Sequence, residues 1–284
     1  MNTNITFESE FAKQHPDRMQ IINYLHNALG LTSVDWSDLT KLNLSTFAEH
    51  VKGRVSPNSA RTYFAVLCGF LGKYQEEGII PCKNPSEVLK AKKVPQQNVA
   101  LTEEELKKIE RYYDGLLTMP GHQPEKDCLT LFLLESYCGA RACDTEGLSE
   151  KNIQDGMLSY VSQKTHVLAT MPVHKKIPLL LSRKPKREYC TYVKNRIIKR
   201  VAQKCGIDQP VTIFYHGELQ TRPKYEFLGT HTARRTFASI LAEKGAPLAE
   251  ISQFMSHSNQ LMTSRYIKVD TQQASPQALS FFNS

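Results

Sequence analysis

A polar, basic stretch with a proline near its middle, AKKVPQQNVA at residues 91–100, interrupts the chain. This composition is typical of a linker between domains. The residues that follow, LTEEELKK, place a glutamate three positions after a threonine, which is the capping-box spacing that begins a helix. A chain of 284 residues has room for two domains. We therefore expect one domain over residues 1–95, a linker over 96–101 and a second domain over 102–284.

Apolar spacing predicts helices on both sides of this linker, and strands in one part of the second domain. Segments such as DRMQIINYLHNAL in the first domain repeat apolar residues on one helical face. In the second domain, residues 126–150 have a helical pattern, whereas residues 153–180 hold the alternating run MLSYVSQK and the short apolar runs VLATMPV and KKIPLLL. His166 falls between two strand runs, where we expect a tight turn. Helical patterns return at 189–204 and from residue 230 onward, so the sequence predicts an α+β fold, mainly α with a small β-sheet.

The charge balance favours an anionic partner. Lys and Arg total 36 against 28 Asp and Glu, a net charge of +8, and nucleic acid is the usual partner of a basic domain. A solvated surface with extra lysines is the alternative. Between Lys175 and Lys204 there are eleven basic residues and one acidic residue, Glu188, which predicts a surface that follows a phosphate backbone. The candidate DNA contacts are Arg61, Lys73, Lys175, Lys176, Arg183, Lys184, Lys186 and Arg187.

Cysteine usage and the absence of long apolar runs exclude several classes of protein. The seven cysteines form no CxxC pair and their number is odd, which argues against a zinc cluster or a secreted disulfide framework. We expect Cys138 and Cys143 to be core residues, and no metal or cofactor. The N-terminus lacks an apolar signal region, and no apolar run reaches the roughly 20 residues that span a bilayer. A cytoplasmic protein without membrane contact is therefore expected.

The segment THTARRTFASIL is a candidate site on a helix. His231 and Arg234 share one helical face because they are three residues apart. With Thr230 as the expected N-cap, both would lie near a helix N-terminus, where the helix dipole favours an anion. Arg235 is about 100° around the helix, and we expect it to pack or to contact backbone instead. Alone, this pattern is weak evidence for a site.

Four further segments extend the pattern in a fixed order. Upstream, CGARACDTEGLS contains Arg141 and Asp144, and YVSQKTHV contains Lys164 at the end of a strand. Downstream, FMSHSN contains His257, and Tyr266 follows nine residues later in MTSRYIKV. Each residue alone has an ordinary structural explanation, such as a helix-end cation, a hairpin lysine or a half-buried tyrosine. Their joint occurrence at these positions points to a site.

This order and spacing resemble the tyrosine recombinase (phage integrase) family. That family carries an Arg in a G-x-R segment, a Lys on a β-hairpin, H-x-x-R, a His or Trp in an L-G-H turn, and a Tyr nine residues beyond. The motifs cover residues 100–270, and residues 1–95 are similar, more loosely, to its small helical (SAM-like) core-binding domain. The chain departs from the common pattern at Ala233, Arg235, Asp144 and the MSH that replaces LGH. None of these is a catalytic position, and only Asp144, which replaces the usual Glu, is at a position that supports a catalytic residue.

The resemblance implies DNA strand exchange through a covalent 3′-phosphotyrosyl intermediate. Two guanidiniums suit the nonbridging oxygens of a phosphodiester, whose transition state carries added negative charge. The implied roles are Arg141 and Arg234 on the phosphate, Tyr266 as nucleophile, His231 in proton transfer, Lys164 as general acid, His257 as a phosphate hydrogen-bond partner, and Asp144 as support for Arg141. Lys175 is an alternative to Lys164.

The resemblance also implies partners. These are double-stranded DNA with a specific recombination site, and further copies of the chain, which would be a monomer in free solution and a tetramer in synapsis. The apolar residues of the C-terminal stretch, Leu279, Phe281 and Phe282, would dock on a neighbouring copy, or alternatively on their own core. Two other functions stay open: DNA relaxation like that of a type IB topoisomerase, and DNA binding without catalysis. Integration, excision and inversion are not distinguished.

Overall fold

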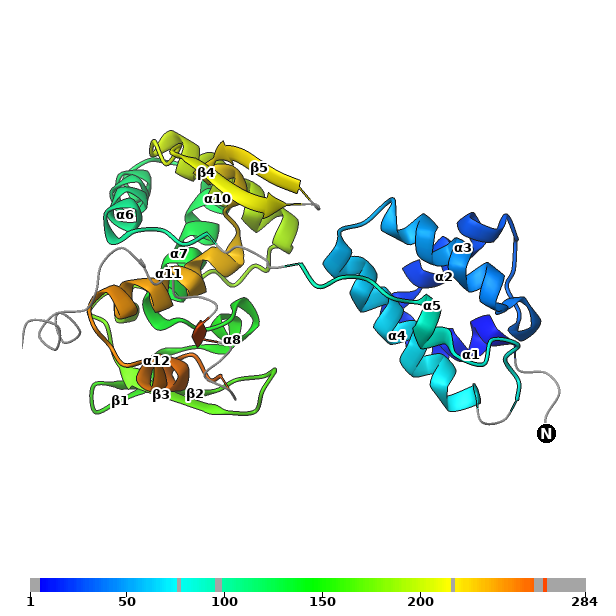
Figure 1. The fold of residues 1–284 in the computed structure, drawn as a ribbon. Coiled ribbons are helices and arrows are strands. Elements are labelled where there is room, and N and C mark those ends of the chain that lie inside the picture. Colours follow the sequence, from blue (N-terminus) through cyan, green and yellow to red (C-terminus); the bar gives the residue numbers. More distant parts are fainter. Residues whose placement is uncertain (1–5, 76–77, 95–98, 216–217, 258–262, 265–284) are drawn as a thin grey trace, which may run out of the picture. The chain divides into compact units, whose positions relative to one another are not determined.

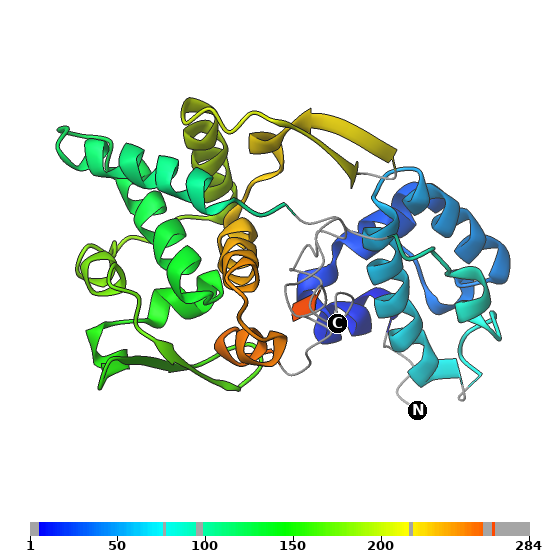
Figure 2. The same cartoon turned by 60° about the vertical axis from the view of Figure 1, so that its left-hand side comes forward.

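The computed structural model describes residues 6–75, 78–94, 99–215, 218–257 and 263–264. The chain divides into two compact units, Met1–Gln97 with Ile213–Gln220 and Asn98–Thr212 with Thr221–Ser284. Figures 1 and 2 show that the described residues before residue 95 are helical and that the second unit combines helices with a small antiparallel sheet. The α+β class expected from the sequence is confirmed. Within the described residues, no helix combines the length and apolar character needed to cross a bilayer.

The N-terminal unit is built on helices whose apolar faces meet in one core. Its helices are α1 Phe7–Gln14, α2 Gln20–Leu29, α3 Lys41–Lys52, α4 Pro57–Gln75 and α5 Pro85–Val88, with 3₁₀ turns at Pro16–Arg18 and Trp36–Asp38. Aromatic rings fill the centre: Trp36 stacks on Phe70 with ring centroids 5.9 Å apart, and Phe7 meets Phe70 edge-on at 5.8 Å. Such pairs add stabilisation beyond the burial of area alone.

The second unit is organised around α7, which is buried on nearly all sides. Its helices are α6 Glu103–Leu117, α7 Gln123–Cys138, α8 Ala142–Gly147, α9 Ile177–Ser182, α10 Thr191–Lys204, α11 Thr230–Glu243 and α12 Leu248–Phe254, with 3₁₀ turns at Glu150–Asn152 and Lys224–Phe227. The capping box expected at the start of α6 is present, because Thr102 and Glu105 exchange hydrogen bonds of 3.2 and 2.8 Å. Cys138, at the end of α7, is buried as expected, but Cys143 is exposed on the solvent side of α8.

A three-stranded antiparallel sheet carries a tight turn at its end. The strands β1 Ile153–Gln154, β2 Met157–Val161 and β3 Leu168–Pro172 pair in sequence order, with Val161 opposite Leu168. A second sheet, β4 Pro210–Tyr215 and β5 Glu218–Pro223, was not expected from the sequence. In Figures 1 and 2, α12 lies beside β3 at one end of the second unit.

The expected third strand, KKIPLLL, is wrong. These residues begin the helix α9, with Pro178 in its first turn, and Ile177, Leu180 and Leu181 are buried. Proline suits the first turn of a helix because its missing N–H would have no partner there. The spacing of the buried residues is helical, and the run is too short for its period to be read from the sequence alone.

Gly139 links α7 to the segment that carries Arg141, and its conformation requires glycine. Its φ is +63°, and a Cβ would lie 2.4 Å from Cδ1 of Phe237 on α11. We expect Gly139→Ala to lower the free energy of unfolding by about 3 kcal/mol, combining the left-handed backbone cost with overpacking. Gly121→Ala is the matched control, because Gly121 has φ +74° and nothing within 4 Å of its Cβ position. Urea denaturation of both variants measures the difference, and equal losses would contradict the close approach of Phe237.

Candidate active site

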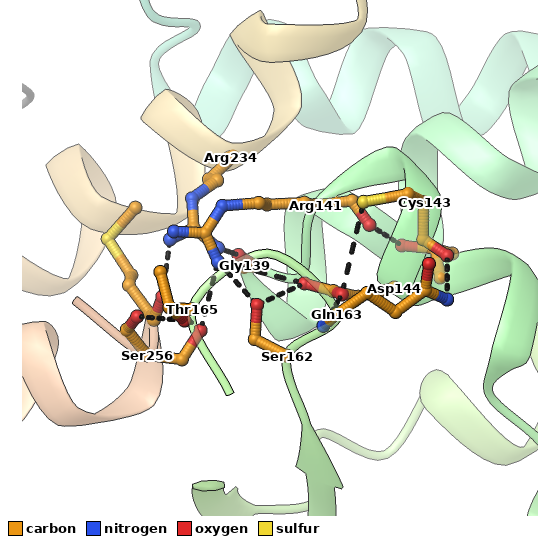
Figure 3. A network of polar contacts seen from close by, with 11 residues as sticks. Gly139, Arg141, Cys143, Asp144, Ser162, Gln163, Thr165, Arg234 and Ser256 are labelled. Carbon is orange, nitrogen blue, oxygen red and sulfur yellow. Dashed lines mark hydrogen bonds and ion pairs between the residues drawn. The ribbon is translucent and has the colours of Figure 1, made fainter. Parts of the chain in front are cut away.

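Four segments that are distant in sequence meet in the second unit. They are the start of α8, the β2–β3 turn, the first turn of α11 and the turn that follows α12 (Figure 3). These segments carry Arg141, Lys164, the His231–Arg234 pair and His257. Tyr266 lies outside the described residues, as do Leu279, Phe281 and Phe282.

Arg234 is a buried cation that joins two of these segments. Its residue is only 2 % exposed, and its guanidinium donates from Nη1 to the carbonyl of Gly139 and from Nη2 to the carbonyl of Met255. A buried charge is tolerated where hydrogen bonds replace its lost hydration. The side chain therefore holds the end of α7 and the end of α12 against α11. Helix α11 begins at Thr230 with Gly229 as its N-cap, so the expected N-cap, Thr230, is wrong by one residue.

Arg141 precedes α8 in extended conformation, and one of its nitrogens is fixed. Nη1 donates to Oγ of Ser162 at 2.8 Å and to Oγ of Ser256 at 3.1 Å, and it lies 3.7 Å from Oδ2 of Asp144. Among the residues that the structure describes, Nη2 and Nε of Arg141 make no hydrogen bond. The guanidinium is thus held in place with donors left for a ligand (Figure 3).

Asp144 connects Arg141 with the end of β2. Its carboxylate is fully buried and accepts from Oγ of Ser162 at 3.1 Å and from the backbone N–H of Gln163 at 2.8 Å. The carboxylate therefore contacts groups of the chain itself and does not face solvent. This geometry suits a support for Arg141.

Ser256 occupies a backbone position that favours glycine. Its φ is +47°, a region that costs a non-glycine residue about 1–2 kcal/mol. The MSH sequence, in place of the LGH of the resembled family, puts a hydroxyl there. That hydroxyl donates to the carbonyl of Met255 at 2.7 Å and accepts from Arg141, so its hydrogen bonds offset the backbone cost.

The two histidines of the constellation favour the neutral form. Burial, followed by the charges of Arg234 and Arg141, lowers the pKa of His257 to about 3. Its Nδ1 lies 2.7 Å from Oγ1 of Thr263. Desolvation also lowers the pKa of His231, and the charges of Arg235, Arg234, Lys164 and Arg141 act in the same direction. Positive charge therefore gathers around two neutral imidazoles, an arrangement that suits an anionic ligand.

Lys164 lies among the cations that act on His231, whereas the alternative general acid, Lys175, does not appear among them. Lys164 is exposed in the β2–β3 turn, and its charge is among those that act on His231. Lys175 is exposed after β3 and acts on His174 instead. Of the two candidate lysines, the structure brings Lys164 to the arginines and histidines.

The lowered pKa of His257 has a consequence for stability. In the unfolded chain its pKa returns to about 6.5, so the unfolded state binds the proton first as pH falls. The contribution of neutral His257 to the free energy of unfolding is fully present above pH 6.5. It is lost progressively as pH falls from 6.5 toward 3. Between pH 7 and pH 5 the free energy of unfolding should fall by about 2 kcal/mol from this group. Denaturation of the wild type and of His257→Gln at both pH values measures it, and an unchanged pH dependence in the variant would contradict it.

A comparison with protein-family models identifies the family of this chain. Residues 83–273 match the model of the phage integrase family, and this range contains every residue of the constellation. The chain belongs to the phage integrase family. The resemblance stated from the motifs is therefore confirmed.

A curated relative and solved structures are also similar to this chain. The chain is 27% identical over 146 residues to the probable integrase/recombinase YoeC of Bacillus subtilis (strain 168), covering 49% of this chain and 76% of the relative. Among solved structures, the Tn1549 transposon integrase with transposon right end DNA has a TM-score of 0.66 at 14% identity, covering 99% of this chain and 100% of that chain. The lambda integrase tetramer bound to a Holliday junction has a TM-score of 0.65 at 17% identity, covering 96% and 80%. At these identities the two structures show a shared fold.

The basic residues predicted to contact DNA lie in different settings in the structure. Arg61, Lys73, Lys175, Arg183, Lys186 and Arg187 are exposed. Lys176 pairs with Glu110, and Lys184 donates to the carbonyls of Glu146 and Leu148. Lys73, although exposed, also donates to Oε1 of Gln14 at 2.7 Å, so Lys73, Lys176 and Lys184 have polar partners within the chain.

Within residues 175–204 Glu188 is the only acidic residue, but carboxylates from elsewhere in the chain also pair with this basic run. Lys194 is buried and pairs with Glu146 at 3.0 Å, and Arg200 pairs with Glu125 at 3.0 Å. These carboxylates come from α7 and α8, far from the run in sequence.

Sequence reasoning missed Ser162, Thr165 and Ser256. Their hydroxyls bond to Arg141, to Asp144 and to the turn after α12. The only signal in the sequence was the serine in MSH at a position where glycine is usual. Nothing in the sequence indicated which residue its hydroxyl would contact.

Proposed function

We propose that this chain is a site-specific recombinase that cuts and rejoins DNA strands through a 3′-phosphotyrosyl bond to Tyr266. One observation carries the proposal: Arg141 and Arg234 are fixed beside two neutral histidines, and Arg141 keeps hydrogen-bond donors without a partner among the described residues. A phosphodiester is an anion that matches this positive charge. Guanidiniums bind its nonbridging oxygens most strongly when charge accumulates in the transition state.

In the cleavage step, the phenolic oxygen of Tyr266 attacks the phosphorus and the bond from phosphorus to the 5′-oxygen breaks. A phenol has a pKa near 10 and needs a base at neutral pH. His231, neutral in the free chain, takes that proton. Lys164 gives a proton to the departing 5′-oxygen, and His257 donates a hydrogen bond to the phosphate. When the 5′-hydroxyl of a second strand attacks, these proton transfers reverse and Tyr266 is released, so resealing needs no cofactor or nucleotide.

The proposal includes the partners. The helical N-terminal domain, over residues 1–95, would also bind DNA, and a linker over 96–101 would join it to the catalytic domain. Lambda integrase was solved as a dimer on a core site and as a tetramer on a Holliday junction, and this supports a tetramer on a specific double-stranded site. A cytoplasmic location is part of the same proposal. Docking of the C-terminal stretch on a neighbouring copy belongs to the same proposal.

The test uses a duplex that carries the site, taken from the DNA ends of the host element, with a nick placed so that the cleaved fragment diffuses away. We expect a covalent protein–DNA adduct that survives denaturation. DNA binding without an adduct would show a non-enzymatic protein. Relaxation of a supercoiled plasmid that lacks the site, without exchange between two sites, would show a topoisomerase. Either result would overturn the proposed function.

A further inference from the structure

The β2–β3 turn that carries Lys164 is a short, closed loop. The N–H of Ser162 donates to the carbonyl of Val167 at 3.0 Å, and the N–H of His166 donates to the carbonyl of Ser162 at 2.8 Å. His166 completes the turn with φ +53°. A lysine side chain is long and flexible, so the place of this turn decides which phosphate oxygen the ammonium group can reach.

On the N-terminal side of Lys164, the turn is tied to the Arg141 segment. The backbone N–H of Gln163 donates to Asp144 at 2.8 Å, and its side-chain Nε2 donates to the carbonyl of Cys143 at 3.0 Å. The two acceptors, Cys143 and Asp144, lie two and three residues after Arg141 in the chain. This side of the turn therefore moves with the phosphate-binding arginine.

On the C-terminal side, Thr165 ties the turn to the segment after α12. Its Oγ1 donates to the carbonyl of Ser256 at 3.2 Å, across 91 residues of sequence. Ser256 is also the residue whose hydroxyl accepts from Arg141, and it lies between Met255, an acceptor of Arg234, and His257. The hydrogen bond of Thr165, the neighbour of Lys164, therefore ends on Ser256, which binds Arg141 and follows the residue that binds Arg234 (Figure 3).

We propose that Thr165 is a positioning residue that sets Lys164 for protonation of the leaving 5′-oxygen. The inference rests on the proposed function, in which Lys164 is the general acid. Thr165 acts through the turn and does not touch the DNA. A displacement of about 1 Å can cost about 100-fold in rate, whereas loss of one hydrogen bond of this kind has only a small effect on stability. The effect should therefore appear in catalysis and not in folding.

The experiment compares Thr165→Val with Thr170→Val on two substrates. Thr170 lies in β3 of the same hairpin, and its hydroxyl pairs with Ser159 at 3.0 Å, away from the turn. One nicked duplex has the normal bridging 5′-oxygen, and the other has sulfur in its place. A thiolate departs without a proton, so cleavage of the sulfur substrate does not need the acid.

We expect Thr165→Val to cleave the oxygen substrate about 10- to 100-fold more slowly and the sulfur substrate at the wild-type rate. Lys164→Ala should show the same pattern with a larger loss, and Thr170→Val should cleave both substrates normally. An equal loss of Thr165→Val on both substrates would show a merely structural role, and no loss on either would show no role. Both results would overturn the inference.

Failure of the proposed function gives a different result. In that case the wild type cleaves neither substrate, and the inferred role of Thr165 falls with it. Hydrogen exchange tests the effect of Thr165 on the turn separately from its effect on cleavage. Thr165→Val should raise exchange at the amides of Ser162 and His166 whether or not cleavage occurs. Increased exchange with unchanged cleavage of the oxygen substrate would contradict the positioning role while leaving the recombinase function intact.

Discussion

Tyr266→Phe is expected to bind the site DNA as the wild type does and to form no covalent adduct on the nicked duplex. Phenylalanine keeps the ring but has no oxygen with which to attack phosphorus. The contacts proposed between DNA and Arg141, Arg234 and the basic surface do not require that oxygen. Affinity should therefore be unchanged while cleavage is lost completely.

The control for this variant is Tyr192→Phe. Tyr192 is an exposed tyrosine on α10, 71 % accessible, and its loss of a hydroxyl should leave adduct formation at the wild-type level. Binding is measured by gel shift, and adduct formation by denaturing electrophoresis. An adduct formed by Tyr266→Phe would mean that another residue is the nucleophile.

Arg141→Ala is expected to slow strand cleavage by about 10²- to 10³-fold, the usual cost of removing one donor to a developing oxyanion. A large loss is expected because Ser162 and Ser256 hold Nη1 of Arg141. The rest of the guanidinium is therefore oriented before DNA binds. Single-turnover cleavage at saturating DNA measures the chemical step separately from binding.

Two further variants control the Arg141 prediction. Arg141→Lys keeps the charge beside the buried Asp144 but loses the fork of donors, and we expect it to fold normally and still to cleave slowly. Arg187→Ala removes an exposed arginine of the basic run and should leave the rate of the chemical step unchanged. Wild-type rates in both Arg141 variants would contradict its role on the phosphate.

The sequence was informative where chemistry dictates residue type and spacing. Arg234 could be predicted because a histidine three residues earlier and a downstream His257 and Tyr266 form one pattern. The contacts of Ser162, Thr165 and Ser256 could not, because they join segments 18 to 115 residues apart. A serine hydroxyl can bond with almost any polar neighbour, and only the packed fold selects one.

Local patterns failed for similar physical reasons. The KKIPLLL run is too short for a period of two to be told from a period of 3.6, and packing made it the helix α9. The basic run looked unopposed because Glu110, Glu125 and Glu146 come to it from other elements. Charge counted along a sequence does not measure charge exposed on a surface.

The most direct test of the central claim is the identity of the residue that becomes bonded to DNA. The wild-type adduct is trapped on the nicked duplex, digested with protease and nuclease, and sequenced by mass spectrometry. We predict a single modified peptide with the nucleotide on Tyr266, attached through its 3′-phosphate. A nucleotide on a different residue, or attachment through the 5′-phosphate, would contradict the account.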